Sequence, residues 1–415
     1  MTTQAALGTI ALQTAALALG ALELVLAASL AYHYLLAVCG ISVPRPALAP
    51  SAPGRCLAVL IPAHNEEAVI GPTVAAARAQ QYPANLVRVC VVADHCTDAT
   101  AMRASEAGAT CLERADGRRG RKAYALQWGF EQLLPARPAF DAFVVIDADS
   151  LLEPTFLGAM AAHLGQGFPA LQGQHRIANP ADSGFTGLAD VDMRINNLVR
   201  NQAKRNLGLS GRLMGDAMCF AREIIERFGW PTESVTEDRE FGLHLALQGI
   251  RTTYVPEAIS HGQATARWED ATVQRLRWYR GMRQVRLSRL GPLWRAAVKL
   301  DLVALDQLLE LALPSISISM LLGMLALGTQ LALPSWPWLF PTTWVVAVVA
   351  LWLLFPVGAL MAARAPWASF RALLWGPVYL AWRAWVGLRA SLGRAQAEWV
   401  RTRRREEMQG KPDGS

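Results

Sequence analysis

The sequence predicts an α/β domain built on a parallel sheet and joined at both ends to helices that span a membrane. From residue 57 onward, short apolar runs alternate with helical patterns, which is typical of a parallel α/β sheet. Residues 24–44 and 311–363 contain no Asp, Glu, Lys or Arg. With 53% hydrophobic residues and a mean hydropathy of +0.21, the chain is too apolar for an ordinary soluble enzyme. Its 415 residues favour two or three structural units.

The first unit, residues 1–44, is expected to hold one transmembrane helix. The charge-free segment at 24–44 matches the length of about 20 apolar residues that crosses a bilayer. Residues 1–22 contain no Lys or Arg, so a cleaved signal peptide is not expected. Residues 45–56 belong to a Pro-, Ala- and Ser-rich stretch that we interpret as a linker.

The α/β domain is expected over residues 57–283. Three strands are predicted, at Leu57–Pro62, Leu86–Ala93 and Ala142–Ile146. Four helices are predicted, at 67–80, 99–107, 122–133 and 153–164. Each strand ends in a polar cluster, and ligands of open α/β sheets bind at the carboxyl ends of the strands. We therefore expect one crevice to be shared by Ala63-His64-Asn65-Glu66, Asp94-His95-Cys96-Thr97-Asp98 and Asp147-Ala148-Asp149.

Membrane-associated segments are expected after the domain. Residues 284–310 alternate basic and apolar residues and predict an interfacial helix region. Residues 311–363 predict two transmembrane helices, at about 311–332 and 342–363, separated near Pro334-Ser335-Trp336-Pro337-Trp338. Asp306 and Glu310 are four residues apart and share a helix face, either at the water boundary or along a path for a polar product.

Residues 364–415 predict an amphipathic interfacial helix followed by a basic tail. Arginines interrupt this Trp- and Leu-rich segment, and each would cost roughly 2.5–3.5 kcal/mol at mid-bilayer. Arginines also follow the first and third predicted spans, whereas the loop between the second and third spans is uncharged. By the positive-inside rule, the α/β domain and the C-terminus are cytoplasmic, in an integral protein of the cell membrane.

Charge and cysteine content restrict the partners. The net charge of +7 is compatible with anionic lipid or a phosphorylated substrate. Nucleic acid is not expected, because no basic run is interleaved with aromatic residues. The six cysteines include no CxxC pair, so we expect reduced thiols and no zinc site. The basic stretch Arg114–Lys122 is typical of a solvated loop, although Lys122 opens a helical pattern and is placed to contact a phosphate.

The Asp147-Ala148-Asp149 triplet is a candidate metal site. Two alternating carboxylates can present one oxygen ligand to Mg²⁺ or Mn²⁺ and the other to a ribose or a metal-bound water. Alone, such a triplet is a weak signal, because an Asp after a strand is often only a turn or N-cap residue. The interpretation as a metal site is strengthened because two other predicted strands also end in acidic clusters.

Two further segments are candidates for chemistry. Thr236-Glu237-Asp238 precedes a helical pattern, with Ser234 and Glu237 spaced as a capping box. Asp238 at the positive end of this helix would stay ionised and act as general base on an acceptor hydroxyl. Gln274, Arg277 and Trp278 fall on one helix face, where Arg277 could hold a diphosphate and Trp278 a sugar ring. An Arg- and Trp-rich interfacial helix is the alternative.

These segments, in this order, resemble family 2 glycosyltransferases, in particular the processive membrane branch of cellulose, chitin, hyaluronan and poly-N-acetylglucosamine synthases. The resemblance covers about residues 57–283. It is carried by Ile61-Pro62-Ala63-His64-Asn65-Glu66, Asp94, Lys122, Asp147-Ala148-Asp149, Thr236-Glu237-Asp238 and Gln274-Arg275-Leu276-Arg277-Trp278.

The resemblance implies a GT-A fold, a Rossmann-like nucleotide-sugar-binding domain, and an inverting transfer from a nucleotide-sugar, most commonly a UDP-sugar. It implies Asp238, with Glu237 beside it, as the catalytic residues, and Asp147 and Asp149 as ligands of Mg²⁺ or Mn²⁺. Acceptor contacts are implied for Trp278 and expected for Asp216. The implied donor-binding residues are His64, Glu66, Asp94, Lys122, Asp147, Gln274 and Arg277.

The acceptor is left open by the sequence. The leading expectation is a growing polysaccharide or other saccharide, and the closest alternative is transfer of one sugar to a lipid. A catalytically silent membrane protein that binds saccharide or nucleotide is an alternative of another class. The sequence does not determine the donor sugar, the linkage or the oligomeric state.

Overall fold

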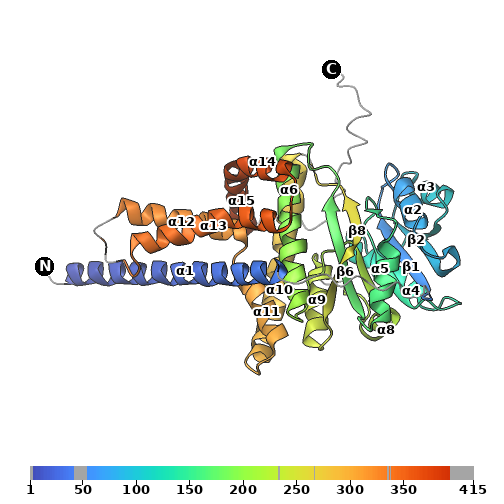
Figure 1. Cartoon of the computed structure of the whole chain (residues 1–415), viewed down its shortest axis with the longest axis horizontal. Coiled ribbons are helices and arrows are strands. Elements are labelled where there is room, and N and C mark those ends of the chain that lie inside the picture. The colour runs from blue at the N-terminus through green and yellow to red at the C-terminus, as the bar shows by residue number, and fades with distance from the viewer. Residues whose placement is uncertain are drawn as a thin grey trace, which may run out of the picture.

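The computed structural model describes residues 3–41, 54–231, 234–265, 267–333, 336 and 338–392. A mixed α/β domain and a group of long helices follow one another along the longest axis of the molecule (Figure 1). Most of the predicted linker, part of the predicted Pro/Trp break and the predicted basic tail lie outside the described residues.

The α/β domain is built on an eight-stranded sheet of order β3-β2-β1-β4-β7-β6-β8-β5. Its strands are β1 (Leu57–Ala63), β2 (Val87–Asp94), β3 (Thr110–Arg114), β4 (Ala142–Val145), β5 (Leu151–Leu152), β6 (Ala170–Ile177), β7 (Met218–Ala221) and β8 (Thr252–Gly262). The three predicted strands are confirmed as β1, β2 and β4, which pair in parallel. Beyond β4 the expectation of a parallel sheet is wrong, because β7 runs antiparallel to both β4 and β6. This reversal places the segment before β7 beside the end of β4.

Helices cover both faces of the sheet. One face packs against α2 (Ile70–Arg78), α3 (Thr100–Glu106) and α5 (Phe156–Gly165). The other packs against α4 (Lys122–Leu133), α8 (Arg222–Phe228) and α9 (Glu237–Leu247). The central strands are therefore buried on both sides, which explains why they are continuous apolar runs in the sequence. Helices α2 to α5 confirm the four predicted helices. A short 3-10 turn, η1 (Ala84–Leu86), precedes β2.

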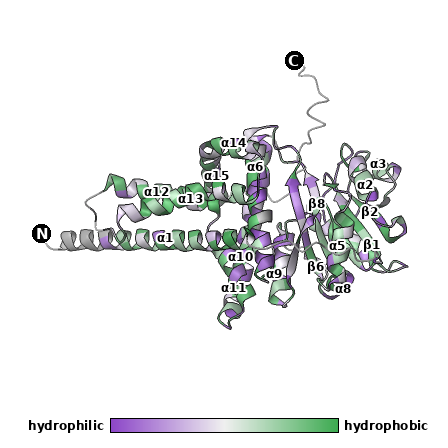
Figure 2. Cartoon of the chain, viewed as in Figure 1, coloured by the Kyte–Doolittle hydropathy of each residue, from purple (hydrophilic) through white to green (hydrophobic). Residues whose placement is uncertain are grey.

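Long apolar helices extend away from the α/β domain. They are α1 (Thr3–Ile41), α12 (Ile316–Ala332) and α13 (Thr342–Ala362), and Figure 2 shows them as largely hydrophobic. Residues Gln13–Ile41 and Thr342–Ala362 are each long and apolar enough to cross a membrane. Helix α12 reaches that length only together with α11 (Leu302–Ala312), from which it is bent by 56°. The described residues thus hold two candidate spans, or three if the bent pair is one span.

Several predicted helix boundaries in the second half are wrong. Helix α10 (Trp268–Ala297) crosses the boundary expected at residue 284, and α11 begins separately where the Asp301 side chain accepts hydrogen bonds from two backbone N–H groups. The interfacial helix expected within residues 364–415 is broken by a 3-10 turn in the part that the structure describes, up to residue 392. The elements there are α14 (Trp367–Ala372), η3 (Leu373–Trp375) and α15 (Gly376–Ser391).

A layer of short helices joins the two parts. The chain passes from β6 into α6 (Gly184–Arg194), the π-helix η2 (Ile195–Asn201) and α7 (Gln202–Asn206). Helix α6 contacts α14, and η2 and α7 contact α1. The sequence analysis did not predict these elements.

Asp306 and Glu310 on α11 are buried and do not lie at a water boundary. The carboxylate of Glu310 is 2% exposed and pairs with Lys204 and, at 3.5 Å, with Arg239. Asp306 pairs with Lys204 at 2.8 Å and accepts a hydrogen bond of 2.8 Å from the hydroxyl of Tyr32. The cluster fastens α1, α7 and α11 to the start of α9.

Candidate active site

One cavity of about 1110 Å³ extends from the strand ends of the sheet to the apolar helices. Its walls include the carboxylates of Asp147, Asp149 and Asp238, and they also include Met320 of α12 and Leu353 of α13. The cavity therefore joins the polar crevice predicted from the sequence to a region lined by apolar helices.

Asp147 and Asp149 lie directly after β4 and face the cavity. Both are half-buried, whereas Ala148 between them is 4% exposed and packs into the core. The Lys122 ammonium, at the first residue of α4, contacts the Asp147 carboxylate and donates a hydrogen bond of 2.6 Å to the Gly215 carbonyl. The triplet thus presents two acidic side chains beside one cation, and the contact between Lys122 and Asp147 was not expected from the sequence.

Asp238 lies next to this pair. Gly215 has a φ of +83°, and a Cβ atom there would lie 3.5 Å from Asp238 Oδ2 and 4.0 Å from Lys122 Nζ. The left-handed backbone conformation therefore favours a glycine, while an added Cβ atom would make only ordinary contacts with these two side chains. The predicted capping box is wrong, because the Ser234 hydroxyl accepts a bond from the Thr236 N–H and no side chain caps α9.

Glu237 and Asp238 titrate together in a buried setting. Burial raises the pKa of Glu237 to about 7, with the charge of Asp238 adding to the shift and Lys122 opposing it. Burial also raises the pKa of Asp238, although the Arg239 backbone N–H and the Arg212 charge counteract it. Burial alone would lower the pKa of Lys122, but Asp147 and Glu237 outweigh it and raise that pKa. Asp238 is thus a stronger base than an exposed aspartate, and Lys122 stays charged.

Helix α10 supplies the wall opposite the strand ends. Gln274, Arg277 and Trp278 all line the cavity, so the predicted shared helix face is confirmed. Trp278 is 39% exposed, and burial lowers the pKa of Arg277 despite the nearby carboxylates. Gly281, one turn further, allows α10 to approach α9, since a Cβ atom there would lie 2.7 Å from Thr236 Cγ2.

The first two strand ends contribute unequally. Glu66 is 4% exposed and lines the cavity. Asp94 is 2% exposed and pairs with Arg114 and, at 2.9 Å, with His95. The His64 ring nitrogen lies 2.6 Å from the Asp94 carbonyl oxygen, and neither His64 nor Asp94 is a wall residue of this cavity. The expectation that Arg114 belongs to a solvated loop is wrong, because its side chain is buried in this ion pair.

Asp216 and His175 form a buried support beneath the triplet. Asp216 Oδ1 accepts a bond of 2.8 Å from the Asp147 N–H, while Oδ2 lies 2.7 Å from both His175 Nδ1 and the Ser260 hydroxyl. Burial would raise the pKa of Asp216, but these bonds and the His175 charge hold it well below the usual range. Both oxygens that were expected to meet an acceptor are therefore engaged within the protein. His175 itself was missed by the sequence analysis.

The residues present fit a divalent cation held partly by substrate. Among the described residues no group of three or more His, Cys, Asp or Glu side chains is arranged to hold a metal. Mg²⁺, however, is commonly bound by one or two carboxylates together with substrate phosphates. Asp147 and Asp149 supply two such oxygen ligands at the cavity wall. A metal here would neutralise charge on a bound diphosphate.

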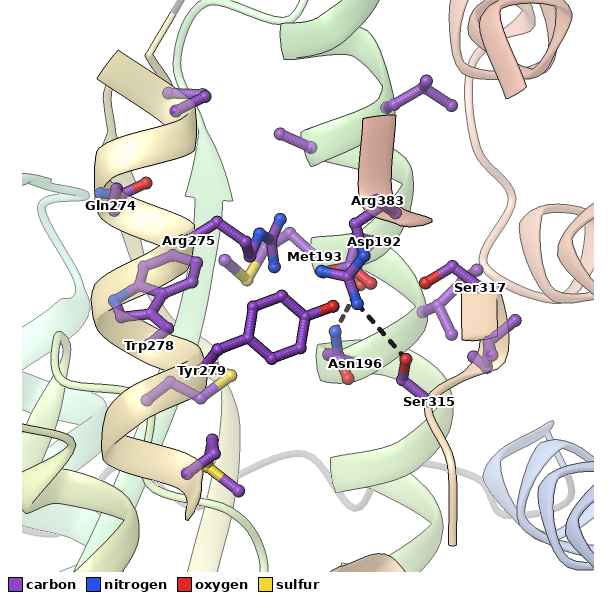
Figure 3. A pocket seen from close by; sticks show the side chains of 18 of the residues that line it. Asp192, Met193, Asn196, Gln274, Arg275, Trp278, Tyr279, Ser315, Ser317 and Arg383 are labelled. Atoms are coloured by element: carbon purple, nitrogen blue, oxygen red, sulfur yellow. Dashed lines mark hydrogen bonds between the residues drawn. The ribbon is translucent and has the colours of Figure 1, made fainter. Parts of the chain in front are cut away.

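The other half of the cavity was not predicted as part of a site. Arg275 and Tyr279 of α10, Asn196 of η2 and Arg383 of α15 all line it (Figure 3). Two features of the sequence could have indicated this half of the site. Arg275 lies inside the segment Gln274–Trp278, and Arg383 is an arginine within an apolar stretch.

An α/β domain with acidic strand ends, a paired lysine, a carboxylate at a helix start and a facing arginine defines a nucleotide-sugar glycosyltransferase of GT-A-like fold. A family model described as "Glycosyltransferase like family 2" matches residues 53–281. The chain belongs to this family, the family 2 glycosyltransferases. The further expectation of the processive branch is not specifically supported.

Two curated relatives and one solved structure illustrate the likeness. "Probable glycosyltransferase YdaM" of Bacillus subtilis is 26% identical over 58% of this chain and 58% of its own. "Beta-monoglucosyldiacylglycerol synthase" of Synechocystis sp. is 28% identical over 56% of this chain and 49% of its own. The chain thus spans about half the length of these relatives. The mannosyltransferase PcManGT from Pyrobaculum calidifontis, solved with GDP-Man and Mn²⁺, shares the fold, with a TM-score of 0.56, 20% identity and coverage of 85% of this chain and 98% of that one.

Proposed function

We propose that the protein transfers one sugar, with inversion, from a nucleotide-sugar donor to a hydroxyl of a lipid acceptor at the membrane. We expect a UDP-sugar as the donor. The observation that carries the proposal is the continuity of one cavity from Asp147 and Asp238 to the apolar side chains of α12 and α13. A soluble acceptor would need no apolar wall of this kind, whereas a lipid headgroup reaches the base only if its tails can remain among apolar side chains.

The apolar end of the cavity reaches the surface of the helices. Met324 and Leu353 line the cavity and are also 37% and 48% exposed. Acyl chains could therefore enter between α12 and α13 from the surrounding bilayer. One relative is named as a synthase of a glycolipid, beta-monoglucosyldiacylglycerol, which supports a lipid acceptor here.

The proposed reaction is a single displacement. Asp238 accepts the proton of the acceptor hydroxyl, whose oxygen forms the new bond to the anomeric carbon. The bond from that carbon to the donor diphosphate breaks, and the nucleoside diphosphate leaves with the electron pair. Lys122 and Arg277 stabilise the leaving diphosphate from the cavity wall. Mg²⁺ or Mn²⁺ at Asp147 and Asp149 would add to this charge neutralisation.

The remaining roles follow from position. Gln274 and Glu66 line the donor side of the cavity and are proposed donor contacts, together with His64 and Asp94 at the adjoining strand ends. Asp216 is proposed to act as a positioning residue, because it fixes the backbone of Asp147 and both of its carboxylate oxygens are engaged within the protein. The catalytic domain is proposed to be cytoplasmic, since Arg364 directly follows α13, whose last turns pack against α6 and η2.

Elongation of a saccharide is a second candidate, and Trp278 favours it. This indole is exposed at the cavity wall and offers a flat face for a sugar ring. A path for a polar product along Asp306 and Glu310 would also favour elongation. The structure does not support such a path, because both carboxylates are held in buried ion pairs.

Product analysis separates the candidates. The purified enzyme is reconstituted in liposomes with diacylglycerol and a panel of radiolabelled nucleotide-sugars, and the product is extracted and sized. The proposal predicts a labelled product that enters the organic phase and carries one sugar. A water-soluble polymer as the main product would overturn the lipid acceptor and favour saccharide elongation.

A further inference from the structure

The membrane-facing half of the cavity contains a cationic patch that the transfer reaction does not use. It is formed by Arg275 and Tyr279 of α10, Asn196 of η2, Ser315 before α12 and Arg383 of α15, and Figure 3 shows these side chains converging on one space. The patch lies between α10 and the start of the apolar helix α12.

Arg383 is buried without a carboxylate partner among the described residues. It is 9% exposed, donates one hydrogen bond of 3.3 Å to the Ser315 hydroxyl, and lies over the rings of Tyr279 and Tyr379 at 5.4 and 6.0 Å. Its Nε atom is buried without a hydrogen-bond partner. A buried charge without a counter-ion is costly, so an anion in the cavity is the partner that this arrangement lacks.

Two further groups suit the same anion. The Arg275 guanidinium donates a bond of 3.3 Å to the Tyr379 hydroxyl and also lines the cavity. The Tyr279 hydroxyl is buried without a partner and points toward Arg383 (Figure 3). Two carboxylates of the cavity wall, Asp192 and Glu310, form no ion pair with Arg383 among the described residues. Asp192 is an exposed residue, and the Glu310 carboxylate already pairs with Lys204 and with arginines of other helices. Two guanidinium groups and a free hydroxyl match a phosphate, which accepts several charge-assisted hydrogen bonds.

The neighbouring side chains indicate where this phosphate comes from. The same cavity is also lined by Met320 and Met324 of α12 and by Leu353 and Val357 of α13. A phosphate held at Arg383 therefore shares one cavity with an apolar wall and with the base Asp238. These three environments fit the tails, the phosphodiester and the terminal hydroxyl of a single lipid molecule.

We infer that Arg383 and Arg275 form a phosphate-binding subsite, and that the acceptor is a phospholipid whose headgroup ends in a free hydroxyl. The inference rests on the proposed lipid acceptor and narrows its class. The phosphate anchors the headgroup, and the hydroxyl beyond it reaches Asp238.

Binding of short-chain lipids tests the subsite without any transfer step. The full-length enzyme in neutral detergent is titrated calorimetrically with dihexanoyl phosphatidylglycerol, with dihexanoylglycerol and with inorganic phosphate. The first two probes both end in a free hydroxyl. The phospholipid differs from dihexanoylglycerol by an added phosphoglycerol group, which supplies the phosphate. We expect the phospholipid to bind at least tenfold more tightly than dihexanoylglycerol, and inorganic phosphate to bind too weakly to measure. Equal binding of the two lipids, or binding of inorganic phosphate as tight as that of the phospholipid, would overturn the inference.

Variants of α15 locate the subsite. Arg383→Met should weaken phospholipid binding at least tenfold, while Arg389→Met, which removes the same charge from the same helix outside the cavity, should leave it unchanged. Arg383→Lys keeps the charge but loses the planar fork, and should bind with intermediate affinity. Unchanged nucleotide-sugar binding in each variant verifies the fold. Phospholipid binding by Arg383→Met or Arg383→Lys as tight as that of the unaltered enzyme would contradict the assignment.

Transfer assays separate this inference from the proposed function. If phosphatidylglycerol and diacylglycerol are both glycosylated at rates that Arg383→Met leaves unchanged, the subsite is wrong and the lipid acceptor stands. If Arg383-dependent phospholipid binding occurs without transfer to any lipid, the subsite stands and the proposed function is wrong.

Discussion

The two ends of the cavity are built in different ways. The donor end consists of short polar segments at strand ends and at the start of α9, within a sheet whose strands are local apolar runs. The acceptor end consists of single side chains from η2, α10, α12 and α15, which are far apart in the sequence. In the proposed function, the chemistry of transfer therefore depends on contiguous segments, whereas the choice of acceptor depends on how distant helices pack.

The largest effect is expected from loss of the proposed general base, Asp238. Asp238→Asn should lower kcat by about 10²–10⁴-fold, because the amide cannot accept the proton of the acceptor hydroxyl. Donor affinity, measured by calorimetry, should change little. Asp116→Asn, in an exposed loop, is the matched control and should retain full activity. Transfer at the normal rate by Asp238→Asn would show that the base lies elsewhere.

Loss of the facing arginine should have the next largest effect. Arg277→Gln should reduce kcat by about 10²–10³-fold, since one charged donor to the leaving diphosphate is removed. Arg280→Gln changes a neighbouring, more exposed arginine of α10 that is not a cavity-wall residue, and serves as the comparison in steady-state kinetics. An equal loss of kcat in both variants would mean that α10 contributes only its overall positive charge and that Arg277 makes no specific contact with the diphosphate.

A smaller, pH-dependent effect is expected from Glu237. Its pKa of about 7 means that it is neutral below pH 7 and ionised above it. Once ionised, it competes with the donor diphosphate for Lys122 and Arg277, so donor affinity should fall as pH rises from about 6 to 8. In Glu237→Gln this fall should disappear. The measurement is donor titration at constant metal concentration, and an unchanged pH profile in the variant would contradict the assignment.

The smallest effect is expected at the apolar end. Met324→Gln places an amide on the acceptor wall and should raise KM for a long-chain lipid roughly three- to tenfold, while KM for the donor stays constant. Leu331→Gln, on the same helix and 63% exposed but not a cavity-wall residue, is the control. Similar KM values for both variants would place the tails outside this cavity.

The sequence predicted correctly the three strands of the sheet that end at the donor side of the cavity. Strands β1, β2 and β4 are buried on both faces, so each is a continuous apolar run that ends where the polar crevice begins. The antiparallel strand β7 and the paired strands β6 and β8 were not predicted. Strand β7 has four residues, and β6 and β8 carry polar side chains toward the site, so their pairing depends on long-range contacts.

The candidate site was also predicted only in part. Lys122, Asp147, Asp149, Asp238 and Arg277 were found because each lies in a recognisable local segment. His175 was missed because its role depends on a bond to Asp216, 41 residues away. Arg383 was noticed as an obstacle to membrane insertion, but only the packing of α15 against α10 places it beside Tyr279.

Photo-crosslinking of an acceptor lipid tests most directly whether one cavity serves both donor and lipid. A phosphatidylglycerol with a diazirine in its acyl chain is illuminated with the reconstituted enzyme, and the labelled peptides are mapped by mass spectrometry. The account predicts labels on Met320 or Met324 of α12 and on Leu353 or Val357 of α13, and sugar on the bound lipid after donor is added. Labels confined to outward-facing residues such as Leu331, with no sugar on the lipid, would contradict it.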